Sequence, residues 1–333
     1  MVQIGLIGYG YWGKNYVATL RDMPSIRTRW VCDSQSRPEE ILNQLPARFS
    51  REYSEVLKDK ETEAVIIATP ASTHYQIGRD ALKRGKHVLI EKPIARTVRE
   101  AEALVCLAKK AGKILMVGHT FMYNPGINYV KDEVEKGAIG RIRYIDIRRV
   151  NPGPIRQDVN VVWDLGTHDI YLSIYLADRL PRTVSYQGAS FNGKLDDVGN
   201  IFLKFEGNLS ANIHNNWIHP KKERQCIVGG EKGALVFDDT LPAHKVTLYK
   251  MGVDFQPAES GIGAFHSAIT SGDIIIPRIS FKQPLMEEIQ HFVDCIKGQA
   301  VCKSSGTNGL DVLRVLEAAD KSRLAKGLEV LVV

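Results

Sequence analysis

The sequence predicts an α/β protein of two domains, and three observations carry this prediction. Near-continuous apolar strands alternate with amphipathic helices over residues 2–120, as in a parallel sheet covered by helices on both faces. A glycine-rich turn, "GLIGYGYWG", joins the first strand to the first helix. After residue 120, strands follow one another with few helices between them, which indicates an antiparallel or mixed sheet. We therefore expect one domain over residues 1–120 and a second over residues 121–333.

The expected strands of the first domain are short apolar runs, at residues 2–8, 28–33, 63–70, 86–93 and 113–118. Amphipathic helices separate them, at residues 11–22, 72–85 and 98–112. Gly112 closes the last of these helices, and glycine suits the left-handed conformation that ends many helices.

The second domain opens at residues 141–150, where polar and apolar residues alternate as in a half-exposed strand. A mostly apolar helix follows at residues 161–172. Further strands are expected at residues 183–191, 200–207, 208–217, 224–230, 233–239 and 245–250. Gly207 and Asn208 join two of them and suit a hairpin turn. Helices near residues 285–297 and 308–325 follow these strands.

Composition excludes several classes of protein. Of the 333 residues, 44% are apolar and 25% are charged, as in an ordinary globular protein. No run of 18 or more apolar residues predicts a membrane span, and the opening residues read as a strand rather than as a signal peptide. The formal net charge of +6 forms no basic stripe, so we expect no nucleic-acid partner. A small anionic ligand fits this mild positive charge better, and a solvated surface that binds no charged partner is the alternative.

The cysteines give no sign of a metal site or of export. The sequence has five, Cys32, Cys106, Cys226, Cys295 and Cys302, and none of them forms a C-x-x-C pair. Their spacing predicts neither a metal site nor a disulfide framework. We therefore expect a cytoplasmic protein.

The glycine-rich turn carries the pattern G-x-G-x-x-G at Gly8, Gly10 and Gly13. The first glycine permits a tight turn, the second lets the backbone approach a pyrophosphate, and the third packs the helix against the strand. Asp33 ends the next strand, 20 residues after Gly13, where a carboxylate can bind ribose hydroxyls. This acid favours NAD, because it would repel the 2′-phosphate of NADP; Arg37 keeps NADP as the less favoured alternative. Flanking residues are further candidate contacts: Tyr9, Tyr11, Trp12 and Ser34.

Two later strand ends supply more candidate contacts to the cofactor, because ligands of such sheets lie beyond the carboxyl ends of the strands. The segment "ATPASTHY" (68–75) offers Thr69, Pro70, Thr73 and His74, although Ser72 or Thr73 could also cap the next helix. The segment "IEKPIA" (90–95) offers Glu91 and Lys92 where the nicotinamide would sit, and the proline after Lys92 permits a cis bond. A surface lysine is the alternative reading of Lys92.

The apolar helix at residues 161–172 holds a carboxylate and an imidazole, Asp164 and His168, four residues apart and so on one helix face. They could form a satisfied buried pair, or contribute to a metal site, although no other histidine or cysteine has matching spacing. The predicted dinucleotide site favours a third interpretation. Oxidation of a carbinol needs a base for the hydroxyl proton, and histidine serves this purpose near neutral pH. Lys92 would then stabilise the developing alkoxide.

With these motifs in order, the chain resembles the Gfo/Idh/MocA family of oxidoreductases over nearly its whole length. The resemblance rests on "GLIGYGYWG", "VIIATPASTHY", "GKHVLIEKPIA", "VGHTFMYNP" and the D-x-x-x-H of "WDLGTHD". It implies a Rossmann domain followed by an α/β domain with a large open sheet, mixed and mostly antiparallel. It also implies catalytic roles for Lys92, Asp164 and His168, and a homodimer or homotetramer formed through that sheet.

The resemblance further implies a substrate class. The stretches "RRVNPGPIRQDVNVVWDLGTHD" and "NNWIHPKKERQCIVGGEKGALVFDD" look like members that act on nucleotide-linked sugars, in particular UDP-N-acetylglucosamine 3-dehydrogenases. The residues expected to bind substrate, besides the three catalytic ones, are Tyr123, Arg156, Gln157 and Asn160. We therefore expect an NAD-dependent dehydrogenase of a sugar hydroxyl. A dehydrogenase of free polyols or sugars and a non-catalytic NAD(H)-binding regulator are the alternatives.

Overall fold

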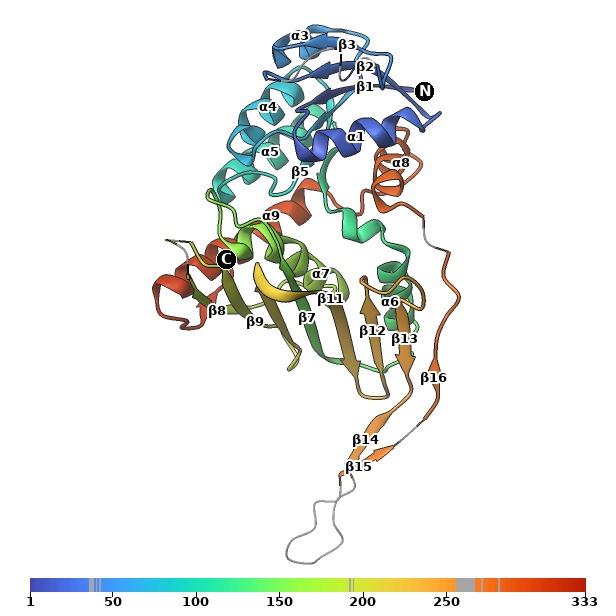
Figure 1. Ribbon diagram of the computed structural model, residues 1–333, viewed down its shortest axis with the longest axis vertical. Coiled ribbons are helices and arrows are strands. Elements are labelled where there is room, and N and C mark those ends of the chain that lie inside the picture. Colours follow the sequence, from blue (N-terminus) through green and yellow to red (C-terminus); the bar gives the residue numbers. More distant parts are fainter. Residues whose placement is uncertain are drawn as a thin grey trace, which may run out of the picture. The chain divides into compact units, whose positions relative to one another are not determined.

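The computed structural model describes residues 1–35, 39, 41, 43–191, 193, 195–255, 267–270, 272–280 and 282–333 (Figure 1). They form two compact units. The first comprises Met1–Asn124 and Lys282–Arg314, and the second comprises Pro125–Phe281 and Val315–Val333. The sequence predicts one boundary, after residue 120, and does not predict that residues 282–314 return to the first unit.

The first unit is built on a six-stranded sheet in the order β3–β2–β1–β4–β5–β6, in which the described neighbours all pair in parallel. The strands are β1 (Val2–Ile7), β2 (Ile26–Cys32), β3 (Arg48–Ser50), β4 (Ala64–Ile67), β5 (His87–Glu91) and β6 (Leu115–Gly118). The helices between them are α1 (Tyr11–Arg21), α3 (Tyr53–Lys58), α4 (Ala71–Lys83) and α5 (Val98–Ala111). The prediction of a parallel α/β sheet is confirmed.

The strand order of this sheet explains where a ligand would bind. From β1 the chain builds outward through β2 to β3, and then returns to add β4, β5 and β6 on the other side of β1. Connections after β1 and β4 therefore leave in opposite directions and open a crevice at the carboxyl ends of these strands. Gly112 ends α5 at φ +60°, which confirms its expected left-handed conformation.

The segment that returns to the first unit carries α8 (Pro284–Ile296) and the start of α9 (Gly306–Leu324). It is attached firmly: the Val117 N–H donates to the Ser304 carbonyl at 2.8 Å, and Met116 forms a bridge with Ser305. The short 3₁₀ turn η1 (Thr120–Tyr123) packs against α8.

The second unit is built on a nine-stranded sheet in the order β16–β13–β12–β11–β7–β10–β9–β8–β17. Only β10 and β7 pair in parallel among its described neighbours, so the prediction of a mixed, mostly antiparallel sheet is confirmed. The strands are β7 (Ile142–Pro152), β8 (Thr183–Ala189), β9 (Val198–Lys204), β10 (Ser210–Asn216), β11 (Ile218–Gly230), β12 (Ala234–Asp238), β13 (Val246–Tyr249), β16 (Ile274–Ile275) and β17 (Val330–Leu331). A separate ribbon pairs β14 (Gly252–Phe255) with β15 (Ser267–Thr270).

Two helices pack on this sheet, α6 (Pro125–Glu135) against β12 and α7 (Thr167–Ala177) against β7 and β10. The predicted hairpin is present between β9 and β10, where Gly207 and Asn208 both have positive φ, at +78° and +62°. Among the described residues, no helix has the length and apolar character needed to cross a bilayer.

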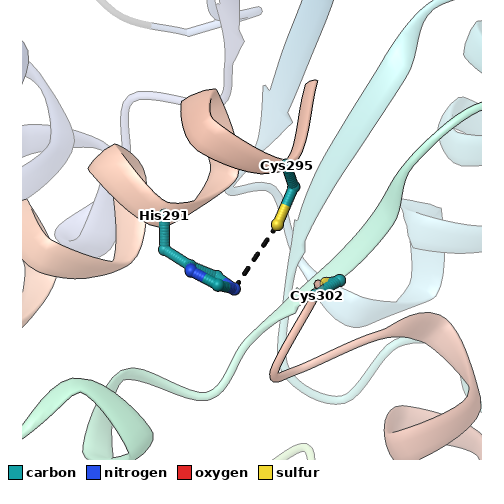
Figure 2. A group of neighbouring side chains, drawn as sticks. All are labelled: His291, Cys295 and Cys302. Carbon is teal, nitrogen blue, oxygen red and sulfur yellow. Dashed lines mark hydrogen bonds between the residues drawn. The ribbon is translucent and has the colours of Figure 1, made fainter. Parts of the chain in front are cut away.

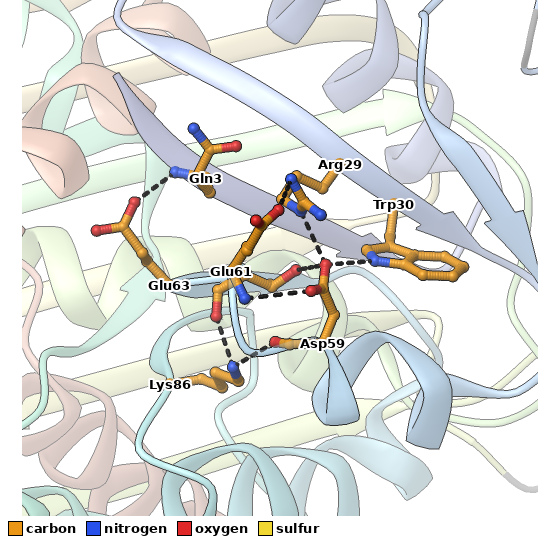
Figure 3. A network of polar contacts seen from close by, with 8 residues as sticks. Gln3, Arg29, Trp30, Asp59, Glu61, Glu63 and Lys86 are labelled. Atoms are coloured by element: carbon orange, nitrogen blue, oxygen red, sulfur yellow. Dashed lines mark hydrogen bonds and ion pairs between the residues drawn. The ribbon is translucent and has the colours of Figure 1, made fainter.

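A polar network in the first unit ties β2 to the segment that precedes β4 (Figure 3). Asp59 accepts hydrogen bonds from Arg29 Nε and from Trp30 Nε1, both at 2.8 Å. The Lys86 ammonium donates to the carbonyl oxygens of Asp59 and Thr62 at 2.8 and 2.6 Å. Burial opposes ionisation of Asp59, but the hydrogen bonds from Arg29, Trp30, Glu61 and Thr62 outweigh it and hold its pKa well below the usual range.

Replacing Asp59 with asparagine is expected to lower the stability of the chain at pH 7 by about 1–3 kcal/mol, since the charged hydrogen bonds that this partly buried carboxylate makes with Arg29 and Trp30 are weakened. Because the folded pKa is depressed, the stabilisation by wild-type Asp59 is complete above about pH 4 and shrinks as the pH falls below it. The urea midpoints of the two proteins should therefore differ at pH 7, and the difference should begin to shrink below about pH 4 and vanish only as the pH falls through the depressed folded pKa. Asp22→Asn is the control, because that carboxylate pairs with Arg21 on the surface. Equal midpoints at pH 7 would contradict the prediction.

Candidate active site

The glycine-rich turn has the form that the sequence predicts, and the structure gives a separate reason for glycine at each of the three positions. Gly8 has φ +104°, and a Cβ there would lie 2.6 Å from the Ala68 carbonyl. A Cβ on Gly13 would collide with the Gly8 carbonyl oxygen, so this glycine permits close packing of α1. A Cβ on Gly10 would meet no protein atom within 4 Å. The backbone at Gly10 is thus open to a ligand, as approach of a pyrophosphate requires.

A pocket of about 650 Å³ lies beside this turn, within the usual range for small-molecule sites. Its lining includes predicted cofactor contacts: Gly8, Tyr9, Gly10, Asp33, Ser34, Thr69, Pro70 and Thr73. It also includes residues that sequence reasoning missed: Gln35, Arg51, Tyr53, Ser72, Gln76 and Ile77. Three of the missed residues belong to α4 and follow Thr69 at helical spacing: Ser72, Gln76 and Ile77. That spacing could have identified them from the sequence.

Other predicted cofactor contacts do not line this pocket: Tyr11, Trp12, Gly13, His74, Glu91 and Lys92. Their contact with cofactor stays a prediction. Arg37, which kept NADP as an alternative, lies outside the described residues.

Two observations support Asp33 as the residue that binds the ribose. It lines the pocket directly after β2, and its Oδ2 accepts the Tyr9 N–H of the glycine-rich turn at 2.7 Å. Its Oδ1 accepts the Gln35 N–H at 2.9 Å. These bonds fix a carboxylate at the wall of the pocket. Together with the open backbone at Gly10, this donor set fits NAD.

Replacing Asp33 with asparagine is expected to raise the affinity ratio of NADP to NAD by about tenfold or more, since the negative charge that repels a 2′-phosphate is removed. Arg51 lines the same pocket and bonds the Ser34 carbonyl at 2.9 Å, so a cation is already nearby. Isothermal titration of both cofactors into both proteins measures the ratio, with Asp22→Asn as the surface control. An unchanged ratio would mean that Asp33 does not face the ribose.

The His74 ring contacts the backbone after two strands, β4 and β5. Its Nδ1 lies 2.8 Å from the Pro93 carbonyl oxygen and its Nε2 lies 2.8 Å from that of Thr69, and the side chain is buried. Burial lowers its pKa, although both carbonyls favour the protonated ring. His74 thus connects the loops that follow β4 and β5, which gives this residue a structural reason to be present.

Lys92 follows β5 and its peptide bond to Pro93 is cis. Beneath it, Glu91 is buried and accepts the Tyr16 hydroxyl at 2.9 Å and the Lys92 N–H at 3.2 Å. Burial raises the pKa of Glu91, against the opposing effects of the Lys92 charge and the Tyr16 hydrogen bond. The backbone of Lys92 is therefore anchored to a buried carboxyl group.

A second buried acid, Glu288 of α8, stands near Glu91, and sequence reasoning missed it. Its Oε2 accepts the Thr120 hydroxyl at 3.1 Å. Burial raises its pKa well above the usual range, and the Glu91 charge raises it further. This pair therefore retains a proton at pH values where an exposed glutamate is ionised. The two residues are 197 positions apart, so no local pattern could have paired them.

Two buried residues of the segment that follows β6 complete this part of the first unit. His119 is buried, and its burial and the Lys92 charge lower its pKa to about 3, so the ring is neutral at pH 7. Tyr123, expected to contact substrate, is buried, with its hydroxyl 2.9 Å from the Ser304 hydroxyl. A role for Tyr123 toward substrate stays a prediction.

In the second unit, Asp164 lies in a π-helical turn, η2 (Val162–Gly166), directly before α7. Such turns are rare and frequently mark functional sites. Asn160 caps the turn, because its Oδ1 accepts the Trp163 N–H at 2.9 Å. The Trp163 indole donates to Asp320 at 2.9 Å and holds the turn in place. Asn160 thus has a capping role, and its predicted contact with substrate stays untested.

His168 is the second residue of α7 and is partly exposed, whereas its neighbour Asp169 is completely buried. Asp169 accepts Arg149 Nη2 at 2.7 Å and Asn215 Nδ2 at 2.8 Å, from β7 and β10. A Cβ on Gly166 would approach Asn215 Oδ1 to 2.7 Å, so this glycine lets the helix lie close to the sheet. The buried ion pair therefore fixes the start of α7 and, with it, the position of His168.

The loop before η2 carries the other predicted substrate contacts, and both are exposed. Arg156 forms two bonds to Asp158, at 2.9 and 2.6 Å, and lies 3.3 Å from Asp164 Oδ1. These hydrogen bonds, together with the charges of Asp164 and Asp158, raise the pKa of Arg156 despite partial burial. Gln157 lies beside it. The structure thus brings Arg156 and Asp164 together in the second unit, while Lys92 belongs to the first.

Residues 2–119 match the family described as "Oxidoreductase family, NAD-binding Rossmann fold", and residues 127–236 match the "GFO/IDH/MocA C-terminal domain". A crystal structure from Magnetospirillum magnetotacticum MS-1, provisionally assigned as an oxidoreductase, is 32% identical. That match covers 95% of this chain and 99% of the other, with a TM-score of 0.79.

Two curated relatives carry assigned activities. UDP-N-acetylglucosamine 3-dehydrogenase of Acidithiobacillus ferrooxidans is 27% identical, and the match covers 97% of each chain. The scyllo-inositol 2-dehydrogenase (NAD(+)) of Bacillus subtilis is 26% identical, with 88% of this chain and 84% of the relative covered. The first matched range contains every residue that lines the pocket beside the glycine-rich turn, and the second contains the strands of the mixed sheet from β7 to β11. The chain therefore belongs to the Gfo/Idh/MocA family of NAD-binding oxidoreductases.

Proposed function

We propose that this chain oxidises or reduces a sugar at a CH–OH/C=O centre, and that the substrate is a nucleotide-linked sugar such as UDP-N-acetylglucosamine, at C3. Bound NAD supplies the acceptor or donor of the hydride. His168 accepts the hydroxyl proton in the oxidative direction. Lys92 orients the hydroxyl and stabilises negative charge on its oxygen. Asp164 orients His168, which lies four residues further along the chain.

The observation that carries the nucleotide-sugar proposal is the position of Arg156. Its guanidinium is exposed on the loop before η2, 3.3 Å from Asp164, and its remaining bonds go to the exposed Asp158. Planar guanidinium groups bind phosphate oxygens through two parallel hydrogen bonds. A diphosphate can displace Asp158, because that ion pair lies at the surface and is weak. Similarity to UDP-N-acetylglucosamine 3-dehydrogenase supports the same substrate class.

The test is formation of NADH by the purified protein with NAD and UDP-N-acetylglucosamine, with inositol and glucose in parallel. Turnover of the UDP-sugar alone supports the proposal. Arg156→Gln should then raise KM for the UDP-sugar by about tenfold or more, since a charged hydrogen bond to phosphate is lost. Arg182→Gln is the matched control, because Arg182 pairs with Glu206 on the surface.

Two other outcomes identify the alternatives. Turnover of inositol or glucose without a nucleotide would favour a dehydrogenase of free polyols or sugars, the activity for which the Bacillus subtilis relative is named. Binding of NADH without turnover of any sugar would favour a regulator that binds the cofactor only.

We also propose that the enzyme works in the cytoplasm as a homodimer or homotetramer formed through the large sheet. Two aromatic side chains on that sheet, Tyr144 of β7 and Phe202 of β9, are 47% and 40% exposed. Aromatic residues are enriched in the interfaces between protein subunits, which supports an interface on this sheet. A molar mass of one chain by light scattering would contradict this assembly.

A further inference from the structure

A histidine and two cysteines lie together in the first unit, away from the pocket beside the glycine-rich turn (Figure 2). His291 and Cys295 belong to α8, and Cys302 follows that helix. The ligand-type atoms of the three side chains all lie within 4.8 Å of one another, and His291 Nε2 is 3.4 Å from Cys295 Sγ. None of these groups has a part in the proposed hydride transfer.

The fold brings the three residues together in two steps. His291 and Cys295 are four residues apart, so they project from one face of α8. The helix ends at Ile296, and Gly298, at φ +71°, turns the chain back toward it. The Val117–Ser304 hydrogen bond then fixes the returning segment against β6. Cys302 is thus held facing α8 by backbone structure on both sides.

Two contacts fix the orientation of the His291 imidazole. The Lys303 N–H donates to His291 Nε2 at 3.1 Å, so this nitrogen carries a lone pair and the ring proton is on Nδ1. The Tyr123 ring packs against the His291 ring at 5.4 Å between centroids and limits its rotation. The same Nε2 lies 3.4 Å from Cys295 Sγ, so a metal ion bound beside the sulfur atoms would take this lone pair in place of the Lys303 N–H.

The spacing of the three atoms suits one shared ion. Bond lengths to Zn²⁺ of about 2.3 Å for sulfur and 2.0–2.1 Å for nitrogen give tetrahedral edges of about 3.6–3.8 Å. The observed limit of 4.8 Å is close enough for small rotations of the thiols to reach them. Cys295 is buried, whereas His291 and Cys302 are partly exposed, so an ion could enter from solvent and still be shielded.

We propose that His291, Cys295 and Cys302 bind a thiophilic divalent metal ion of the Zn²⁺ class, with one coordination position left for an exogenous ligand. One imidazole and two thiolates favour such an ion over Mg²⁺ or Ca²⁺, which prefer oxygen ligands. The bound ion would tie α8 to the segment after it and stabilise the first unit. The sequence spacing of the cysteines predicts no such site, because Cys302 reaches α8 only through the fold.

The first experiment titrates Co²⁺, which reports on zinc sites by absorbance, into the reduced, metal-free full chain. We expect one Co²⁺ per chain, with a thiolate-to-cobalt charge-transfer band and intense tetrahedral bands, and stoichiometric displacement by Zn²⁺. Cys295→Ser and Cys302→Ser should each abolish these bands. Cys106→Ser is the matched control and should keep them, because Cys106 is an exposed cysteine of α5.

A second measurement uses the wild-type chain alone, so its result does not depend on whether the cysteine variants fold. Zn²⁺ should slow alkylation of Cys295 and Cys302 in the wild-type chain by about tenfold or more, because a metal-bound thiolate is not free to react, and leave Cys106 unaffected. Mass spectrometry of the digested chain identifies each labelled cysteine. Absence of the cobalt bands in the reduced chain, or equal labelling with and without Zn²⁺, would overturn the proposal. If the reduced chain binds no Co²⁺, and Cys295 and Cys302 instead form a disulfide under mild oxidation, the two cysteines are a redox pair and not metal ligands.

Discussion

Replacing Lys92 with methionine is expected to lower kcat by about 10²–10⁴-fold, while the dissociation constant of NAD changes little. Methionine keeps the length of the side chain and removes its charge. The loss falls on kcat because stabilisation of the alkoxide develops only in the transition state. Initial rates of NADH formation, with a sugar that the wild-type enzyme oxidises, measure the effect. Calorimetric titration of NAD into the same preparation measures the cofactor affinity.

The control for this variant is Lys110→Met, which removes an exposed lysine of α5 from the same unit. It should leave both quantities unchanged. The Lys92 backbone is anchored by Glu91 through the main-chain N–H, so replacement of the side chain leaves that hydrogen bond in place. Near-normal turnover of Lys92→Met would remove Lys92 from the mechanism. A parallel loss of NAD affinity would place its main effect on the cofactor.

Replacing His168 with asparagine is expected to lower kcat by a similar factor, about 10²–10⁴-fold, because no side chain then accepts the hydroxyl proton. The residual rate should rise with pH, since hydroxide must remove the proton instead. The buried Arg149–Asp169 ion pair holds the start of α7 independently of His168, so the fold of the second unit should survive. The pH profile of kcat for both proteins, with circular dichroism as a check of folding, tests this expectation.

A second histidine of the same unit provides the control. His244 is exposed in a turn at φ +56°, a conformation that asparagine adopts readily, so His244→Asn should leave kcat and its pH profile unchanged. A residual rate in His168→Asn that is independent of pH would contradict a role for His168 as the base.

Local sequence patterns determined the parts of this protein that depend on near neighbours. The glycines of the turn, the left-handed end of α5 at Gly112 and the Gly207–Asn208 hairpin each follow from the conformation that a few adjacent residues require. The parallel sheet follows equally from its buried apolar strands, because a strand covered on both faces has no polar side. Asp33 could be found because its spacing from the turn is fixed by the β–α–β unit.

The tertiary structure alone decided which polar side chains are used for packing and which remain available for chemistry. His168 and Asp169 are adjacent acid–base residues in one helix, and only the position of Arg149 on β7 makes Asp169 the buried one. Asn160 caps the helix that begins after it, and that helix opens with a π-helical turn, which i, i+4 periodicity does not reveal.

Contacts between distant segments were likewise outside the reach of local reasoning. Glu288 lies near Glu91, and Cys302 faces His291 and Cys295, because residues 282–314 return to the first unit. The sequence by itself therefore determined the fold class, the cofactor turn and the residues to test. The tertiary structure decided burial and long-range pairing, since these depend on which surfaces the folded chain brings together and not on the order of the residues within them.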